Sequence, residues 1–133
     1  MIPRLNEHGY LPPGVHRATL EEVIARFGHG NEQREAEGTS LRWLEPLARN
    51  VGATRMLING SFVTSRSEPN DVDCVVLVGP DYDESTLTAQ KLLAGVPFLE
   101  ISVVVESEYR RFAEVIFATD RGIIEKGVVE VLL

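Results

Sequence analysis

One run of residues, Asp71-Val72-Asp73-Cys74-Val75-Val76-Leu77-Val78, has the composition of a buried β-strand and opens with two aspartates. Valine favours strands, and a nearly continuous apolar run is typical of a strand that is covered on both faces. Side chains two positions apart in a strand point to the same face, so the carboxylates of Asp71 and Asp73 form a pair. The run therefore predicts an interior strand with two like charges at its entrance.

Further strands are expected before and after this run. Residues 54–58 form a short apolar segment upstream, and residues 98–105 form a second run rich in valine and isoleucine. The run 98–105 is also expected to be an interior strand, because it is almost continuously apolar. Residues 128–133 are expected to be a strand or strand-like segment that completes the same sheet.

Helices are predicted between these strands and before them. Thr19 followed by Glu22 is typical of a capping box at the start of a short helix. A longer amphipathic helix is expected over residues 32–50, with an interruption or a kink at Gly38 or Pro46.

Two later helices follow from the same kind of signal. Asp83 or Ser85 can cap a helix that ends at Gly95, and another helix is expected to begin near Ser107. The first 18 residues contain three prolines and two glycines without any period, which predicts an extended N-terminal arm or loop. Residues 19–133 are then expected to form one small α/β or α+β sheet domain.

The composition limits the class of protein. The chain has 133 residues, of which 44% are hydrophobic and 25% are charged, as is typical of one globular domain with its own core. Its formal net charge of −7 disfavours a large nucleic-acid footprint, because phosphate backbones are bound by clustered lysine and arginine. A small nucleotide held through a metal ion is compatible with this charge.

The single cysteine and the terminal sequence predict the compartment. Cys74 is the only cysteine, so it cannot form an intrachain disulfide, and its apolar surroundings suit a reducing compartment. The N-terminal residues lack an apolar core of signal-peptide length, and no apolar run approaches the roughly 20 residues that cross a bilayer. We therefore expect a cytoplasmic protein that has no membrane partner.

The aspartate pair has two interpretations of about equal weight. It is either a solvated strand entrance, with Asp71 capping a turn, or a site at which a cation lies between the two carboxylates. Glu100 favours the cation if its strand is central, because an unpaired carboxylate in a buried strand carries a large desolvation penalty. At the edge of the sheet, Glu100 would simply face water.

Gly60 and Ser61 lie where the strand at residues 54–58 should end. Glycine allows a backbone to approach a ligand closely, amides at a helix N-terminus attract phosphate, and Ser61 adds a hydroxyl donor. A Gly-Ser dipeptide alone is too common to define a site. Arg121 and Lys126 could reach phosphates as well, although charged residues beside a turn are more often only solvated.

Taken together, Gly60-Ser61, a nine-residue gap, Asp71-Val72-Asp73 and the later Glu100 resemble the signature of the polymerase-beta-type nucleotidyltransferase superfamily, in particular its minimal single-domain members. The resemblance spans most of the chain, and its catalytic motif is short. Four other stretches resemble a group of bacterial domains of this kind: Ile58–Thr64, Leu11–His16, Thr119–Gly122 and Lys126-Gly127.

The resemblance implies a mixed β-sheet flanked by helices and a metal-dependent transfer of a nucleoside monophosphate from an NTP to a hydroxyl, with release of pyrophosphate. It implies that Gly60 and Ser61 hold the nucleotide phosphates. It further implies that Asp71, Asp73 and Glu100 are catalytic and bind one or two Mg²⁺ ions that stabilise the attacking and leaving oxygens.

The sequence departs from this pattern at one position. Many minimal members carry an arginine three residues after the serine, where this chain has Thr64, and Arg66 lies nearby but out of register. Thr64 and Arg66 are the remaining candidates for nucleotide binding.

The acceptor implied by analogy is a protein side chain, such as a tyrosine on a partner toxin, or a tRNA end or a small molecule. The alternative is a catalytically inactive nucleotidyltransferase-like protein that acts as a binding or antitoxin-type partner. A third option is a structural subunit whose carboxylates only solvate the end of a strand.

Overall fold

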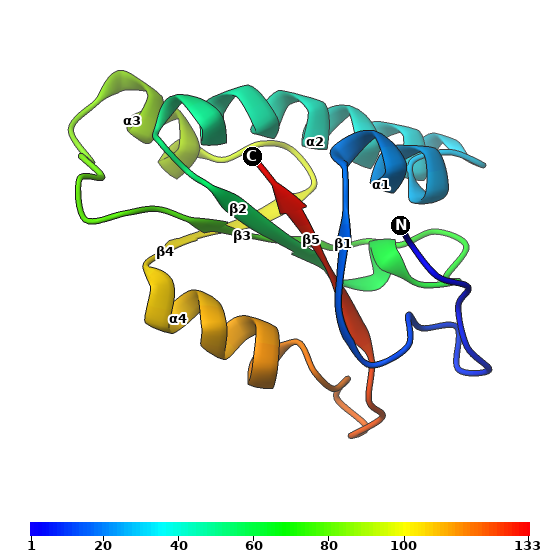
Figure 1. Cartoon of the computed structure of the whole chain (residues 1–133). Coiled ribbons are helices and arrows are strands. Elements are labelled where there is room, and N and C mark those ends of the chain that lie inside the picture. The colour runs from blue at the N-terminus through cyan, green and yellow to red at the C-terminus, as the bar shows by residue number, and fades with distance from the viewer.

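A five-stranded sheet organises the computed structural model, which describes all 133 residues (Figure 1). In spatial order the strands are β1 (Gly14–Ala18), β5 (Gly127–Leu132), β2 (Arg55–Asn59), β3 (Val72–Leu77) and β4 (Leu99–Val104). β2 is antiparallel to both β3 and β5, whereas the β1–β5 and β3–β4 pairs are parallel. The expected small α/β fold with a mixed sheet is therefore confirmed.

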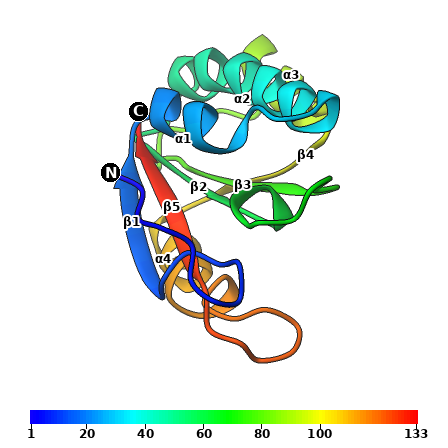
Figure 2. The same cartoon turned by 90° about the vertical axis from the view of Figure 1, so that its right-hand side faces the viewer.

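Helices cover both faces of the sheet, as Figures 1 and 2 show. One face packs against α1 (Leu20–Phe27), α2 (Glu32–Asn50) and α3 (Leu87–Ala94) around a core of 19 buried residues. The other face packs against α4 (Glu106–Arg111), which continues into a π-helical turn over residues 112–116, around seven buried residues. None of these helices has the length and the apolar character to span a membrane.

The helix boundaries mostly follow local signals. Thr19 and Glu22 form the expected capping box of α1. The cap of α3 is Thr86 rather than Asp83 or Ser85, because the Asp83 carboxylate accepts hydrogen bonds from Ser85 in a turn before the helix. α2 is unbroken from residue 32 to residue 50, so the interruption that we expected within it is absent.

The end of the N-terminal arm is a strand, contrary to our expectation of an arm or loop over residues 1–18. Residues 14–18 form β1, which pairs in parallel with β5. β1 is an edge strand without a buried residue, so it shows no apolar alternation in the sequence. The arm crosses the start of β5 at Gly127, where a Cβ atom would lie only 2.1 Å from the carbonyl oxygen of Pro12. Only glycine allows this crossing.

β4 is an edge strand, and the prediction that it is interior is wrong. Val104 is its one buried residue, and Glu100 is exposed. The interior strands are β3, as predicted, together with β2 and β5. The desolvation argument for Glu100 as a metal ligand therefore fails, and any role of Glu100 in a site has to follow from its neighbours.

Candidate functional site

Asp73 lies on the face of the sheet that α4 covers. Along β3, Cys74 and Val76 belong to the core beneath α1, α2 and α3, whereas Val75 and Leu77 belong to the cluster beneath α4. Because side chains alternate along a strand, Asp73 shares the face of Val75 and Leu77. This position is at the start of β3, beyond the buried part of that cluster.

Strand register places three polar side chains in one row across the sheet. Asp73 on β3 is paired with Asn59 on β2 and with Glu100 on β4. Directly paired residues have Cβ atoms only about 4.5–5.5 Å apart. Glu100 is thus brought beside Asp73 by register, although it lies on an exposed edge.

This row lines a cavity of about 950 Å³. The same cavity is lined by the other residues that the sequence singled out as catalytic, metal-binding or nucleotide-binding. These predicted residues come from three separate segments of the chain. They are Gly60, Ser61, Thr64, Arg66, Asp71, Asp73 and Glu100.

A second wall of the cavity comes from the N-terminal arm and from the loop before β5. Figure 2 looks onto this region, with the dark-blue arm and the orange-red loop below the green segment that follows β2. The hydroxyl of Tyr10 donates a 2.5 Å hydrogen bond to Asp120 and so joins the two segments. No local pattern marks Tyr10 as a site residue, because this contact joins residues 110 positions apart.

Gly60 and Ser61 form a tight turn against Asp71. Gly60 has a φ of 89°, and a Cβ atom there would lie 2.8 Å from both the carbonyl oxygen and Oδ2 of Asp71, so only glycine allows this approach. Ser61 donates hydrogen bonds from its backbone N–H, at 3.1 Å, and from its hydroxyl to Asp71 Oδ1. The N–H of Phe62 donates to the Asp71 carbonyl. The donors that the resemblance assigns to phosphate are therefore occupied by Asp71.

Thr64 is also engaged within its own loop. It is 9% exposed, and its hydroxyl donates to the Ser61 carbonyl at 2.6 Å. The same hydroxyl accepts a hydrogen bond from the Arg66 N–H at 3.2 Å. Thr64 thus shapes the loop, whereas the side chain of Arg66 is exposed and forms no ion pair.

A buried arginine on α2 holds this loop in place. The guanidinium of Arg34 donates to the carbonyl oxygens of Phe62 at 2.8 Å, Thr64 at 2.9 Å and Arg66 at 2.5 Å. A planar group with five donors suits such a set of carbonyls. Burial lowers the pKa of Arg34. Arg34 was not predicted as a site residue, although it is a basic residue between two acids in the first turn of α2.

The carboxylates of the cavity have no protein cation as a partner. The pKa of Asp73 is raised from 3.8 to about 6, first by burial, then by the neighbouring carboxyl group of Glu100 and by the charges of Asp71 and Glu100. The charge of Lys126 acts in the opposite direction. None of the ion pairs within 4.0 Å includes Asp71, Asp73 or Glu100.

The donor set fits Mg²⁺ in kind, because this ion prefers oxygen ligands and binds through one or two carboxylates together with phosphate oxygens and water. The side chains do not form a site by themselves, since no three His, Cys, Asp or Glu residues are grouped to hold an ion. One oxygen of Asp71 is already bound by Ser61. The arrangement therefore suits an ion that a nucleotide brings with it better than an ion held by protein alone.

Asn59 adds an unsatisfied polar group to this wall. It is 2% exposed, it lines the cavity, and its Oδ1 atom is buried without a hydrogen-bond partner. Leaving such an oxygen unpaired costs about 1–3 kcal/mol. Asn59 was not predicted as a site residue, although a polar residue that ends an apolar strand directly before Gly60 is a usable sequence signal.

Comparison with known proteins identifies the family. A family model described as "Family of unknown function (DUF6932)" matches residues 3–132, a span that includes both walls of the cavity. No curated protein and no solved structure matches the chain. Because the match covers almost every residue, the chain belongs to the DUF6932 family.

Proposed function

We propose that the cavity binds a nucleoside triphosphate together with Mg²⁺ and transfers its nucleoside monophosphate to a hydroxyl, with release of pyrophosphate. One observation carries this proposal: Asp71, Asp73 and Glu100 line one cavity with no protein cation as a partner, and the pKa of Asp73 is raised to about 6. Carboxylates in such a position gain free energy from a cation that enters with a ligand.

Each carboxylate has a place in this reaction. Asp73 and the free oxygen of Asp71 bind the ion, which supplies charge stabilisation to the phosphoryl oxygens. Glu100 is exposed at the open edge of the sheet, where it meets the acceptor and takes the proton of its hydroxyl. The acceptor oxygen then bonds to the α-phosphorus, and the bond from that phosphorus to the bridging oxygen breaks to release pyrophosphate.

The acceptor is a protein side chain, for example on a cognate toxin, a small molecule or a tRNA end. The net charge of −7 makes RNA the least suitable of these acceptors. A second candidate function is nucleotide binding without transfer, as in an antitoxin-type partner. It is favoured by the Ser61 hydrogen bonds that occupy one oxygen of Asp71.

The test is transfer of label from α-³²P-labelled NTPs, with MgCl₂, to a cell lysate and to the protein itself. The four NTPs are tried in turn with the wild type, with Asp73→Asn and with a control variant, Asp81→Asn. Asp81 is an exposed aspartate outside the cavity. We expect labelling by the wild type and by Asp81→Asn, and a loss of labelling by Asp73→Asn.

Thermal denaturation separates the alternatives. A ligand at 100 times its Kd adds about 2.7 kcal/mol to the free energy of unfolding. Stabilisation by an NTP and Mg²⁺ without label transfer supports the binding protein, and the absence of both stabilisation and transfer for all four NTPs contradicts both functions.

A further inference from the structure

The second wall of the cavity carries a lysine whose charge has no partner. Lys126 lines the cavity, and its ammonium group forms no ion pair within 4.0 Å. Its backbone is fixed by a hydrogen bond from its N–H to the Ala118 carbonyl at 2.9 Å. The ammonium group is therefore free to bind an anionic ligand in the cavity.

The side chain of Lys126 is held against an aromatic ring. Its Nζ lies 5.9 Å from the centre of the Tyr10 ring, within the range of a cation–π interaction. Tyr10 is itself held by its hydrogen bond to Asp120. Lys126 is half-buried, whereas Arg66 and Arg121 on the rim of the cavity are exposed. Lys126 therefore loses less side-chain entropy than either arginine when it binds a ligand.

Asp120 forms no ion pair with this lysine within 4.0 Å, although the charge of Lys126 is the last of the causes that lower the pKa of Asp120. Its Oδ1 atom accepts backbone hydrogen bonds from Gly122 at 2.8 Å and Ile124 at 2.9 Å, and its Oδ2 atom accepts the Tyr10 hydroxyl. These bonds are the main reason that the pKa of Asp120 is lowered. The carboxylate of Asp120 is thus satisfied by the loop and serves to position Tyr10.

The first wall of the cavity, formed by Asn59, Asp73, Glu100 and the segments at Gly60 and Asp71, offers few hydrogen-bond donors to the phosphates of a nucleotide. The N–H groups of Ser61 and Phe62 bind Asp71, and the neighbouring side chains of Asp73 and Glu100 are carboxylates, which accept but do not donate when ionised. Apart from the exposed Arg66, the cationic side chains that line this cavity, Arg121 and Lys126, lie on the second wall.

We propose that Lys126, positioned by Tyr10, binds the β- and γ-phosphates of the nucleotide and stabilises the charge of the leaving pyrophosphate. This inference rests on the proposed function, in which the carboxylate wall holds the ion and the α-phosphate. The two walls then divide the substrate between them, with the transferred group on one side and the leaving group on the other.

The test compares affinities for ligands that differ in their phosphates. Calorimetry measures the Kd of the best-bound NTP with Mg²⁺ and of the matching monophosphate for the wild type, Lys126→Met and Lys126→Arg. We expect Lys126→Met to weaken NTP binding about tenfold or more, which is about 1.4 kcal/mol, and to leave monophosphate binding unchanged. Lys126→Arg keeps most of the affinity. Unchanged NTP binding, or an equal loss for both ligands, overturns the inference.

Lys91 provides the matched control, because it is the only other lysine and is exposed on α3 outside the cavity. Lys91→Met is expected to bind the NTP like the wild type. If the wild type binds no nucleotide, the proposed function fails, and inorganic tripolyphosphate is then the probe. Binding of tripolyphosphate that Lys126→Met abolishes would keep Lys126 as a polyphosphate-binding residue without the nucleotide, and the absence of such binding would end the inference.

A labelling experiment on the wild type avoids dependence on a folded variant. An acyl-phosphate derivative of the NTP transfers its acyl group to a lysine beside the bound phosphates, and mass spectrometry identifies the labelled residue. We expect Lys126 to be labelled, with protection by excess NTP and Mg²⁺. Equal labelling of Lys91 and Lys126, without protection, contradicts the inference.

Discussion

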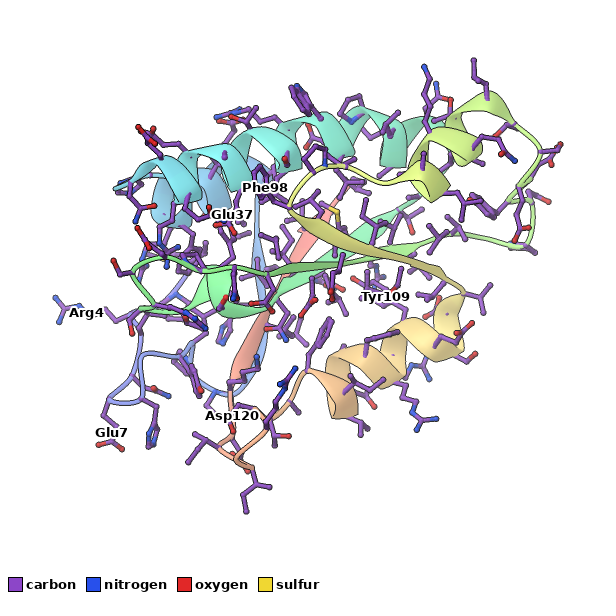
Figure 3. All side chains as sticks on the ribbon, turned by 180° about the vertical axis from the view of Figure 1, so that it is seen from behind. Arg4, Glu7, Glu37, Phe98, Tyr109 and Asp120 are labelled. Atoms are coloured by element: carbon purple, nitrogen blue, oxygen red, sulfur yellow. The ribbon has the colours of Figure 1, made fainter.

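Glu130 and Asp73 lie on the same face of the sheet, two strands apart, and have opposite surroundings. Glu130 on β5 is 5% exposed, accepts a 2.8 Å hydrogen bond from the Tyr109 hydroxyl, and pairs with Arg17 at 3.0 Å and Arg55 at 4.0 Å. Figure 3 shows Tyr109 directed from α4 toward the sheet. Asp73 has other carboxylates as its near neighbours, and its pKa is raised.

The difference distinguishes a carboxylate that builds the fold from one that is open to a ligand. A buried charge is tolerated when the protein supplies its partners, as it does for Glu130. The protein supplies no such partner for Asp73. A cation from outside would therefore be stabilised by binding to it, because the cost of burying the negative charge is not yet compensated. The carboxylate with the poorer surroundings is therefore the better functional candidate.

Glu37, on the opposite face of the sheet, is a buried carboxyl group in a third kind of surroundings. It lies between α2 and the sheet and is fully buried (Figure 3). Its side chain accepts only a 3.4 Å hydrogen bond from Gln33, and its Oε1 atom has no partner. Burial raises the pKa of Glu37, which favours the neutral acid.

The largest expected effect is on catalysis. In the proposed function Asp73 is a ligand of the ion, and since such an ion contributes several kcal/mol, Asp73→Asn should lower transfer about a hundredfold or more. The initial rate of label incorporation measures this loss, with Asp81→Asn as the control. If Asp73→Asn and Asp81→Asn transfer label equally fast, the lack of a partner for Asp73 does not mark it as a catalytic residue.

The next largest effect is on stability, and it should separate the two carboxylates. Glu130→Ala leaves the buried Tyr109 hydroxyl without its acceptor and should lower the free energy of unfolding by about 2–3 kcal/mol. Asp73→Ala removes repulsion among carboxylates and should change that free energy by less than about 1 kcal/mol. Urea unfolding without Mg²⁺ measures both values.

A double variant checks the mechanism of this loss. Tyr109→Phe in the Glu130→Ala background removes the unsatisfied hydroxyl, so the two losses should not add. Simple additivity would show that the hydrogen bond does not cause the destabilisation.

A smaller effect is expected in the dependence of stability on pH. The pKa of Asp73 is about 6 in the folded protein and 3.8 in its ordinary state, so the folded state holds the extra proton between these values. The free energy of unfolding contributed by Asp73 is therefore highest below about pH 4 and falls as the pH rises to about 6.

Thermal denaturation of the wild type and of Asp73→Asn is measured between about pH 4 and about pH 6. The fall in stability that Asp73 causes in the wild type over this range should be absent in the variant. Stabilisation by Mg²⁺ and an NTP should increase as the pH rises through 6, because the ion binds the ionised carboxylate. Parallel pH profiles for the two proteins would contradict the assignment of the raised pKa to Asp73.

The smallest effect concerns the surface end of the Glu130 cluster. Arg55 lies 4.0 Å from Glu130 Oε2, and its side chain is 43% exposed. Because exposed ion pairs contribute little, Arg55→Met should cost less than about 1 kcal/mol in urea unfolding. A loss as large as that of Glu130→Ala would mean that the ion pair, rather than Tyr109, stabilises the buried carboxylate.

Local signals made much of the fold predictable. The capping box at Thr19 and the valine-rich run of β3 act between neighbouring residues, and both elements formed as expected. Strand order depends on contacts between distant residues, and this is where prediction failed. An acid within an apolar run is expected to be buried. Glu100 lies on an edge strand and is exposed, whereas Glu130 lies on an interior strand and is buried.

The candidate site was predictable in part for the same reason. The Gly60 turn and the Asp71–Asp73 pair are local features, and all seven candidates line one cavity. The second wall was not visible, because Tyr10 meets Asp120 only after the arm and the loop before β5 pack together. Asn59 and Arg34 were not predicted because their importance depends on distant contacts. The Oδ1 atom of Asn59 is left without a partner, and the guanidinium of Arg34 binds a set of carbonyl oxygens.

The position of β5 has a consequence for how the cavity comes into existence. β5 is the last strand in the sequence but lies between β1 and β2, so the sheet is split in two until β5 inserts. Pairing strands so far apart in sequence is a slow step in folding. Until it occurs, Lys126 and Tyr10 have no fixed place opposite Asp73. A chain that has folded only through β4 would have half a cavity, so under the proposed function ligand binding would report complete folding.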